Sequence, residues 1–182
     1  MKPNFFLAAL FTTFWPVLIS AQDWQYAKRY SAATGSILTN AAVSTAPDGS
    51  TYLVGTVRGT VMFDNISVST PTGITQSYLL KLDMGAQAVW VQTFDQKAYD
   101  VTTDAQGNVF VAGAIAVGSP ASDSLTFIAK YDANGQLLAS LESSGAGKSW
   151  AKAVRTDAAG NCYATGWKTG TVSFGAFTLP DQ

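Results

Sequence analysis

The sequence contains no histidine and only one cysteine, Cys162, among its 182 residues. Histidine is the most common metal ligand and the usual general base at neutral pH, so its absence removes the standard parts of a metal centre or an acid–base site. One cysteine cannot form a disulfide within the chain. We therefore expect no catalytic residue, no cofactor-binding residue, no metal ligand and no bound cofactor, and we predict that the chain is not an enzyme.

Charged residues are also scarce. They make up 13% of the chain, which is about half of the ~25% typical of soluble domains. The formal net charge is −1, and no basic run is longer than the pair Lys28 and Arg29. Because nucleic-acid binding needs a clustered basic surface, no nucleic-acid partner is expected.

The sequence after residue 22 lacks a convincing amphipathic helix and is rich in short alternating segments instead. These segments carry β-branched and aromatic residues, which is typical of β-strands. They are Ser50–Val57, Ser77–Asp83, Asn108–Ala114 and Thr126–Asp132. Gly-containing tetrapeptides such as Pro47–Ser50 and Ala105–Asn108 separate them, and Gly or Asn can take the positive φ of a tight hairpin. The pattern predicts an all-β fold.

The N-terminus has the layout of a secretory signal peptide. Lys2 supplies a positive charge, an apolar run extends from Phe5 to Ile19, and the small residues Ser20 and Ala21 precede a polar segment. The apolar run is shorter than the ~20 residues of a membrane-spanning helix. We therefore expect residues 1–21 to be removed on export, with no stable membrane insertion after cleavage, and the mature chain to be secreted or to lie at the cell surface.

One phrase recurs three times along the chain, at Val43–Thr56, Val101–Ala114 and Val154–Trp167. A second phrase recurs between these copies, because Tyr78–Phe94 aligns with Phe127–Ser143. Recurrence over three copies favours architecture over chemistry, since a repeat is one supersecondary unit that stacks on its neighbours.

The repeats divide the domain of residues 22–182 into units at roughly 41–94, 98–143 and 151–182. Four short strands in about 50 residues match the size of a β-propeller blade. The predicted fold is an incomplete β-propeller of about three four-stranded antiparallel blades. The alternative is a β-solenoid of hairpins, whose repeats are usually shorter.

Two of these phrases, Ala98–Gly113 and Ala151–Gly166, resemble the repeats of the seven-bladed β-propeller family of secreted bacterial proteins. Gly170–Leu179 resembles the version common in surface and secreted proteins of Bacteroidetes-like bacteria. The resemblance extends from about Asn40 to Leu179 and implies a propeller fold with a binding or adhesion role. Closed propellers have 4 to 8 blades, so we expect this chain to be the N-terminal portion of a longer protein or the product of a shortened reading frame. An open sheet edge would then favour self-association.

Two short motifs resemble ligand-binding loops. Glu142–Trp150 contains Gly-Lys-Ser, as phosphate loops do, but Glu142 stands where that motif requires glycine, so a turn between units is favoured. Tyr131–Gln136 begins like a calcium loop but lacks the downstream glutamate, so an Asx turn is favoured.

Two sets of side chains are candidates for a shared surface. Asp48, Asp104 and Asp157 are predicted to hold equivalent positions in three units, which favours turn capping over a catalytic pair. The tryptophans at strand ends favour packing between blades over a carbohydrate-stacking surface. They are Trp24, Trp90, Trp150 and Trp167.

These observations predict a secreted or cell-surface, non-catalytic repeat protein that acts as a binding or adhesion scaffold. Its partner would be an extracellular ligand, glycan or protein, contacted through loops. The alternative is the N-terminal fragment of a secreted propeller enzyme, a hydrolase or a quinoprotein, whose active site lies in further blades. Fold alone does not decide between them.

Overall fold

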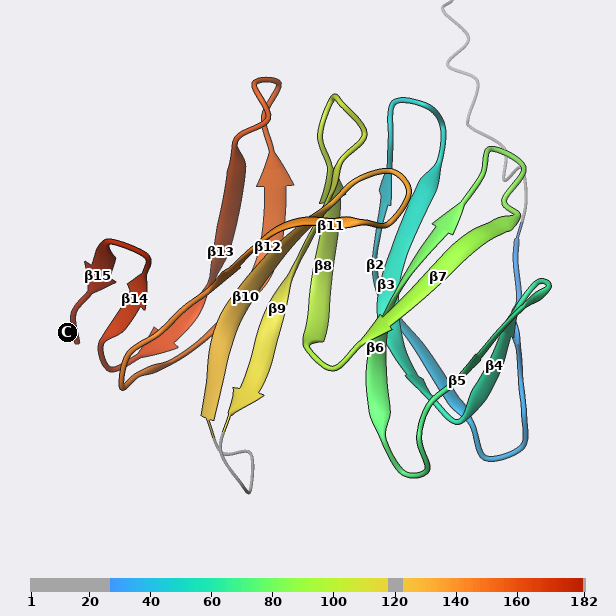
Figure 1. The fold of residues 1–182 in the computed structure, drawn as a ribbon, viewed down its shortest axis with the longest axis horizontal. Coiled ribbons are helices and arrows are strands. Elements are labelled where there is room, and N and C mark those ends of the chain that lie inside the picture. Colours follow the sequence, from blue (N-terminus) through green and yellow to red (C-terminus); the bar gives the residue numbers. More distant parts are fainter. Residues whose placement is uncertain (1–26, 118–122, 182) are drawn as a thin grey trace, which may run out of the picture.

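The structure, a computed structural model, describes residues 27–117 and 123–181 and consists of strands and turns (Figure 1). Fifteen strands and no helix occur in these two ranges, so the all-β prediction is confirmed. With no helix there, the described part of the chain has none that could cross a membrane. The predicted signal peptide at residues 1–21 and Trp24 lie outside the described residues.

The first unit forms a four-stranded antiparallel sheet, here called sheet 1. Its strands follow the order β2 (Ile37–Thr45), β3 (Thr51–Arg58), β6 (Thr75–Leu82) and β7 (Ala88–Phe94). The hairpin of β4 (Thr60–Phe63) and β5 (Ile66–Ser69) is inserted between β3 and β6 and pairs with the short β1 (Ser31–Ala32). This small sheet covers one face of sheet 1, where Phe63 and Tyr78 are buried together.

The second unit repeats the same meander as sheet 2. Its order is β8 (Lys97–Thr103), β9 (Val109–Val117), β10 (Asp123–Tyr131) and β11 (Leu137–Glu142). The predicted strands and hairpin turns of both units are therefore confirmed.

The third unit contains fewer paired strands than the two complete sheets. β12 (Lys148–Thr156) and β13 (Cys162–Thr169) form a two-stranded sheet. The chain then enters the hairpin of β14 (Val172–Phe174) and β15 (Phe177–Leu179), which pairs with itself. This hairpin corresponds in sequence to β4–β5, which likewise pairs within itself and not with its preceding long strand.

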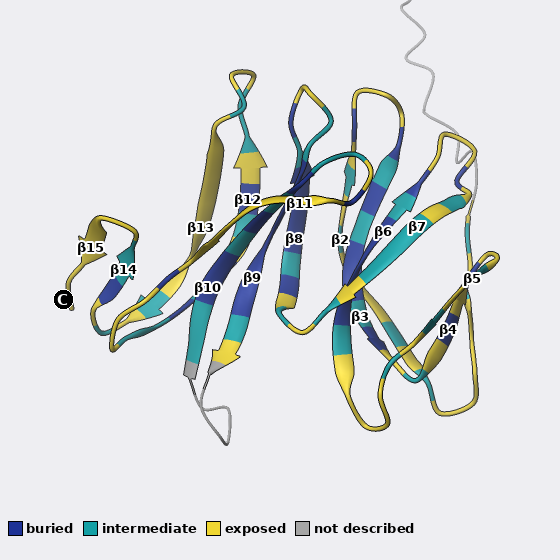
Figure 2. Ribbon diagram, viewed as in Figure 1, coloured by how far each residue is buried: buried dark blue, intermediate teal, exposed yellow. Residues whose placement is uncertain are grey.

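The three units pack side by side through the faces of their sheets (Figure 1). Tyr52, Val54 and Leu79 of sheet 1 are buried against sheet 2, and Phe110 and Ala112 of sheet 2 are buried against the third unit. Dark bands of buried residues accordingly run through the middle of the long strands (Figure 2). Two separate interfaces between sheets therefore make up most of the core.

A glycine recurs at the same structural position in every unit. Gly55, Gly113 and Gly166 each pair with the residue that precedes a β-bulge in the first strand of their unit. A Cβ added to them would lie 1.9, 1.9 and 2.0 Å from a carbonyl oxygen of that first strand. No side chain fits at that distance, so the recurring glycine reflects a backbone requirement.

A threonine hydrogen bond recurs between the units. Thr103 Oγ1 donates to the carbonyl oxygen of Thr45 at 2.8 Å, and Thr156 Oγ1 donates to the carbonyl oxygen of Thr103 at 2.8 Å. These residues end the first strands of the three units. The same contact therefore joins unit one to unit two and unit two to unit three.

Candidate functional site

Five tight turns lie along one edge of the sheets, at the upper edge of Figure 1. We call this edge the turn rim. In each turn, the first residue donates its N–H to the carbonyl of the fifth, and the fourth donates to the carbonyl of the first, at 2.8–3.1 Å. The turns span residues 46–50, 83–87, 104–108, 132–136 and 157–161.

In four of these turns, the first residue is an aspartate whose side chain accepts hydrogen bonds from backbone N–H groups of the same turn. Asp104 Oδ1 accepts the backbone N–H groups of Gln106 at 3.0 Å and Asn108 at 2.8 Å, and Oδ2 accepts Asn108 Nδ2 at 2.7 Å. Asp157 makes the same three contacts in the third unit. Asp83 and Asp132 each accept two backbone N–H groups in the same way. The Asx-turn interpretation is confirmed, including for Tyr131–Gln136.

These contacts lower the pKa of two rim carboxylates, Asp104 and Asp157. Burial acts to raise the pKa of Asp104, but hydrogen bonds from Asn108 and Gln106 outweigh it, so the pKa is lowered. Hydrogen bonds from the Asn161 side chain and backbone lower the pKa of Asp157. The rim therefore presents fixed negative charges whose lone pairs are already largely used by the turns.

Asp48 does not hold the position predicted for it. Ala46 occupies the place of Asp104 and Asp157 in the first unit, because Ala46 makes the turn-closing backbone contacts. Asp48 lies two residues later and accepts the N–H of Ser50 at 2.9 Å and its hydroxyl at 3.0 Å. The expected equivalence is wrong for Asp48, although its capping role is correct. The rim aspartates belong to separate turns.

The Gly-Lys-Ser segment joins two sheets and forms no phosphate loop. Ser149 is 1% exposed, and its Oγ accepts the N–H of Thr126 at 3.1 Å and lies 2.8 Å from Ser143 Oγ. Its hydroxyl is therefore used within the core, and residues 143–147 form the connection from β11 to β12. The predicted turn between units is confirmed.

The described tryptophans divide between packing and exposure. Trp90 Nε1 donates to the carbonyl oxygen of Ala133 in sheet 2 at 3.3 Å, so Trp90 packs between units as predicted. Trp150 and Trp167 instead stack on each other with centroids 4.3 Å apart, and Trp167 is 45% exposed. Both are also among the residues that line the space between sheet 2 and the third unit, and for this pair packing between blades remains a prediction.

An apolar groove of about 340 Å³ lies between sheet 2 and the third unit. We call it the interface groove. Ile128 and Leu141 of sheet 2 form one wall, and Ala151 and Gly166 of the third unit form the other. The sequence did not reveal this groove, because it arises from which strands lie next to each other.

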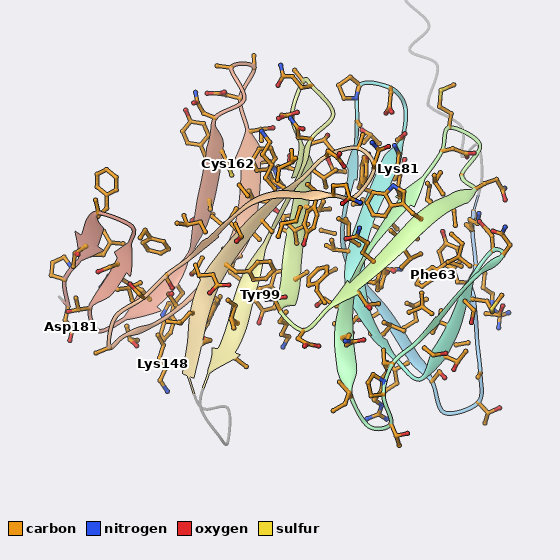
Figure 3. All side chains as sticks on the ribbon, viewed as in Figure 1. Phe63, Lys81, Tyr99, Lys148, Cys162 and Asp181 are labelled. Atoms are coloured by element: carbon orange, nitrogen blue, oxygen red, sulfur yellow. The ribbon has the colours of Figure 1, made fainter. Side chains whose placement is uncertain are left out.

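Reactive side chains are few in the part of the chain that the structure describes. No group of three or more Cys, Asp or Glu residues there could hold a metal ion. Cys162 is exposed at the start of β13 (Figure 3).

Comparisons with known proteins identify no relative of this chain. No protein-family model matches it, and no curated protein matches it. The resemblance to propeller repeats therefore remains a prediction.

Proposed function

We propose that the chain is an exported, non-catalytic repeat protein that binds an extracellular glycan or protein through its turn rim. Its sheets are blades of the β-propeller type. The observation that carries the proposal is the turn rim itself, in which five turns with one hydrogen-bonding scheme lie along one edge.

The relation between successive units supports the blade assignment. Each complete sheet is a meander in strand order, and its first strand lies next to the first strand of the following unit. No sheet contains strands from two units among the described residues, so the units meet through their faces. A β-propeller, in which four-stranded sheets repeat around a central axis, has this arrangement. It disfavours the solenoid alternative, in which neighbouring repeats share one continuous stack.

The composition of the turns supports a binding role. Function commonly resides in loops held by a rigid scaffold, and here side-chain and backbone hydrogen bonds fix each turn. The turn tips carry different exposed residues, including Asp48, Met84 and Gln106, with Met84 77% exposed. Rigid turns with varied tips lower the entropic cost of binding a partner.

The test compares two exposed apolar residues at opposite edges of sheet 1. The whole chain, expressed with its N-terminus for export, is applied to immobilised glycans and extracellular matrix proteins. Met84→Ser at the rim should lower binding by about tenfold if Met84 is a central contact. Ile74→Ser, in the loop before β6, is the control and should leave binding unchanged, since Ile74 is 48% exposed at the other edge.

A screen of hydrolase substrates accompanies the binding assay. Turnover of any substrate by the chain would contradict the non-catalytic assignment. Binding that Ile74→Ser and Met84→Ser reduce equally, or no binding to any surface, would contradict the turn rim as the contact surface.

A further inference from the structure

A pocket lies between the outer strands of sheet 1 and sheet 2. We call it the outer pocket. Its volume is about 430 Å³, which is within the ~300–1,000 Å³ typical of small-molecule sites. Sheets 1 and 2 each contain four paired strands, so complete sheets form both walls. Aromatic and polar side chains meet in the pocket, namely Phe94, Gln96, Phe127, Tyr131, Ser140 and Glu142.

Three hydrogen bonds join the two walls at the end of the pocket nearest the turn rim. Lys81 Nζ and Trp90 Nε1 donate to the carbonyl oxygen of Ala133 at 3.0 and 3.3 Å. Gln92 Nε2 donates to the carbonyl oxygen of Gly135 at 2.5 Å. These bonds hold β6 and β7 against the β10–β11 turn. The spacing of the walls is therefore set by the protein itself, as in pre-formed ligand sites.

Two phenylalanine rings form the apolar part of the pocket. Phe94 ends β7, and Phe127 lies on β10 in the core between the sheets. Their ring centroids are 6.2 Å apart in an edge-to-face arrangement. Phe127 is 4% exposed, whereas Phe94 is only half-buried. Phe94 therefore offers an accessible ring surface for the apolar side of a ligand.

The pocket is one of the places where the units differ in sequence. In the second repeated phrase, Gln92 and Phe94 of sheet 1 stand where the next unit has Leu141 and Ser143. Residues that recur in every unit, such as the glycine before the bulge, serve the architecture. An amide and an aromatic ring at these two positions are not required by the repeat, so they are specific to this pocket.

A buried hydroxyl in the pocket makes no hydrogen bond with the described residues. It belongs to Tyr131, which lines the pocket and is 8% exposed. Burial raises the pKa of Tyr131, so the hydroxyl stays protonated and can both donate and accept. Buried tyrosine hydroxyls usually have a hydrogen-bond partner. A polar ligand in the pocket could supply one.

The remaining polar side chains restrict the chemistry of such a ligand. Gln96, Ser140 and Glu142 line the pocket and form no hydrogen bond or ion pair with other described residues. The amide and the hydroxyl can each donate and accept, and the carboxylate can only accept. None of the described residues that line the pocket is a lysine or an arginine. A neutral ligand rich in hydroxyl groups matches this set, whereas an anionic ligand would be repelled by Glu142.

We propose that the outer pocket binds a neutral hexose unit of an extracellular glycan. The apolar face of the sugar ring contacts Phe94, and the sugar hydroxyls form hydrogen bonds with Tyr131, Gln96 and Glu142. The carboxylate, without a basic neighbour, selects against uronic acids and phosphorylated or sulfated sugars. The site is separate from the turn rim, and the inference does not rest on the role proposed for that rim.

The test titrates the whole, isotope-labelled chain with D-glucose, D-galactose and D-mannose, and with the uronic acid of each. The side-chain amide signals of Gln92 and Gln96 in NMR spectra report binding. A small ligand in an open pocket binds weakly, so we expect a Kd on the order of 1 mM for the best hexose. Its uronic acid should bind about tenfold more weakly at pH 7, and Glu142→Gln should reduce this difference.

A pair of matched variants tests the unpartnered hydroxyl. Tyr131→Phe removes only the hydroxyl and should weaken hexose binding about fivefold. Tyr52→Phe is the control and should leave binding unchanged. Tyr52 belongs to the same core cluster and its hydroxyl also lacks a partner among the described residues, but Tyr52 does not line the pocket. Neither change removes a hydrogen bond of the folded chain, so both variants should fold.

A second pair tests the carboxylate. Glu142→Gln should weaken binding of the neutral hexose by about threefold, because a carboxylate accepts hydrogen bonds more strongly than an amide does. Asp95→Asn is its control and should have no effect. Asp95 is exposed beside Phe94 but does not line the pocket.

Three results would overturn the proposal. They are no binding of any of the three hexoses at tens of millimolar, hexose binding that Tyr131→Phe and Glu142→Gln both leave unchanged, and tighter binding of the uronic acids. Met84→Ser should leave hexose binding intact. If Met84→Ser abolishes it while Tyr131→Phe does not, the sugar binds at the turn rim and the outer pocket is not its site.

Discussion

The two interfaces between sheets begin alike and end differently. At the first, Tyr52 and Leu79 are fully buried, and Lys81 Nζ of sheet 1 donates to the carbonyl of Ala133 in the β10–β11 turn at 3.0 Å. At the second, Ala151 and Val154 are buried near the first strands, but Leu141 on the outer strand is 43% exposed. The inner half of the second interface is closed, and its outer half is the interface groove.

This difference separates what a repeat encodes locally from what its neighbours provide. The bulge, the recurring glycine and the threonine hydrogen bond occur in the third unit as in the others, although β13 is exposed. Backbone geometry therefore follows the local phrase. Burial depends on which strands cover the phrase. Tyr52 in β3 is fully buried, whereas Tyr163 at the same place in β13 is 60% exposed.

The largest expected effect comes from removing the same tyrosine side chain where it is buried and where it is exposed. Tyr52→Ala should lower the free energy of unfolding by about 4 kcal/mol, because it empties a closed interface. Tyr163→Ala should cost less than about 1 kcal/mol, because that ring is mostly in solvent. Chemical denaturation followed by tryptophan fluorescence measures both, and equal losses would contradict the difference in burial between the two tyrosines.

Tyr52→Phe sharpens this comparison. Burial, followed by the charges of Asp48 and Asp132, raises the pKa of Tyr52 to about 12, and its hydroxyl has no hydrogen-bond partner among the described residues. The second unit already has Phe110 at this position. Removing the hydroxyl should leave stability unchanged or raise it by up to about 1 kcal/mol. A clear loss of stability would show that the hydroxyl is satisfied.

A second substitution tests the recurring glycine at the closed interface. Gly113→Ala places a Cβ 1.9 Å from the carbonyl oxygen of Lys97 and 2.8 Å from the ring of Phe127, so two elements must move. We expect a loss of about 3 kcal/mol in thermal or chemical unfolding. The control is Gly85→Ala, whose Cβ would meet only the Asp83 side chain at 3.3 Å and should stay within about 0.5 kcal/mol of the parent.

Much of the fold could be predicted from the sequence, and the failures have a common cause. The turns and strands follow from local signals, such as Asp104 followed by Gly107 and then by an alternating strand. The place of Asp48 was misjudged because turn register depends on backbone hydrogen bonds, which one carboxylate in a tetrapeptide does not reveal. The stacking of Trp150 on Trp167 was missed for a related reason, since it depends on which strands are neighbours.

The candidate sites were less predictable than the fold. Each turn of the rim can be predicted from its own sequence. That the turns lie along a single edge follows only from the strand order of each sheet. The interface groove has no signal of its own, because Ile128, Leu141 and Gly166 come from three strands in two units. Comparing unit with unit could have found it. Gly166 is equivalent to Gly55 and Gly113, which pair with Tyr78 and Phe127 in the other two units.

The effect of acid differs between Asp104 and its less buried counterpart Asp157. Both have a lowered pKa in the folded chain, so each stabilises the fold above the unfolded value near 4 and loses that contribution as the pH falls through its folded pKa. Asp104→Asn should lower stability by about 1 kcal/mol at pH 7 and flatten the loss between pH 5 and pH 3. Asp157→Asn should change the profile less, because Asp104 is 2% exposed and lies 3.6 Å from Lys130 Nζ. Urea midpoints at these pH values test the order, which fails if the acid-induced loss in Asp104→Asn equals that of the parent.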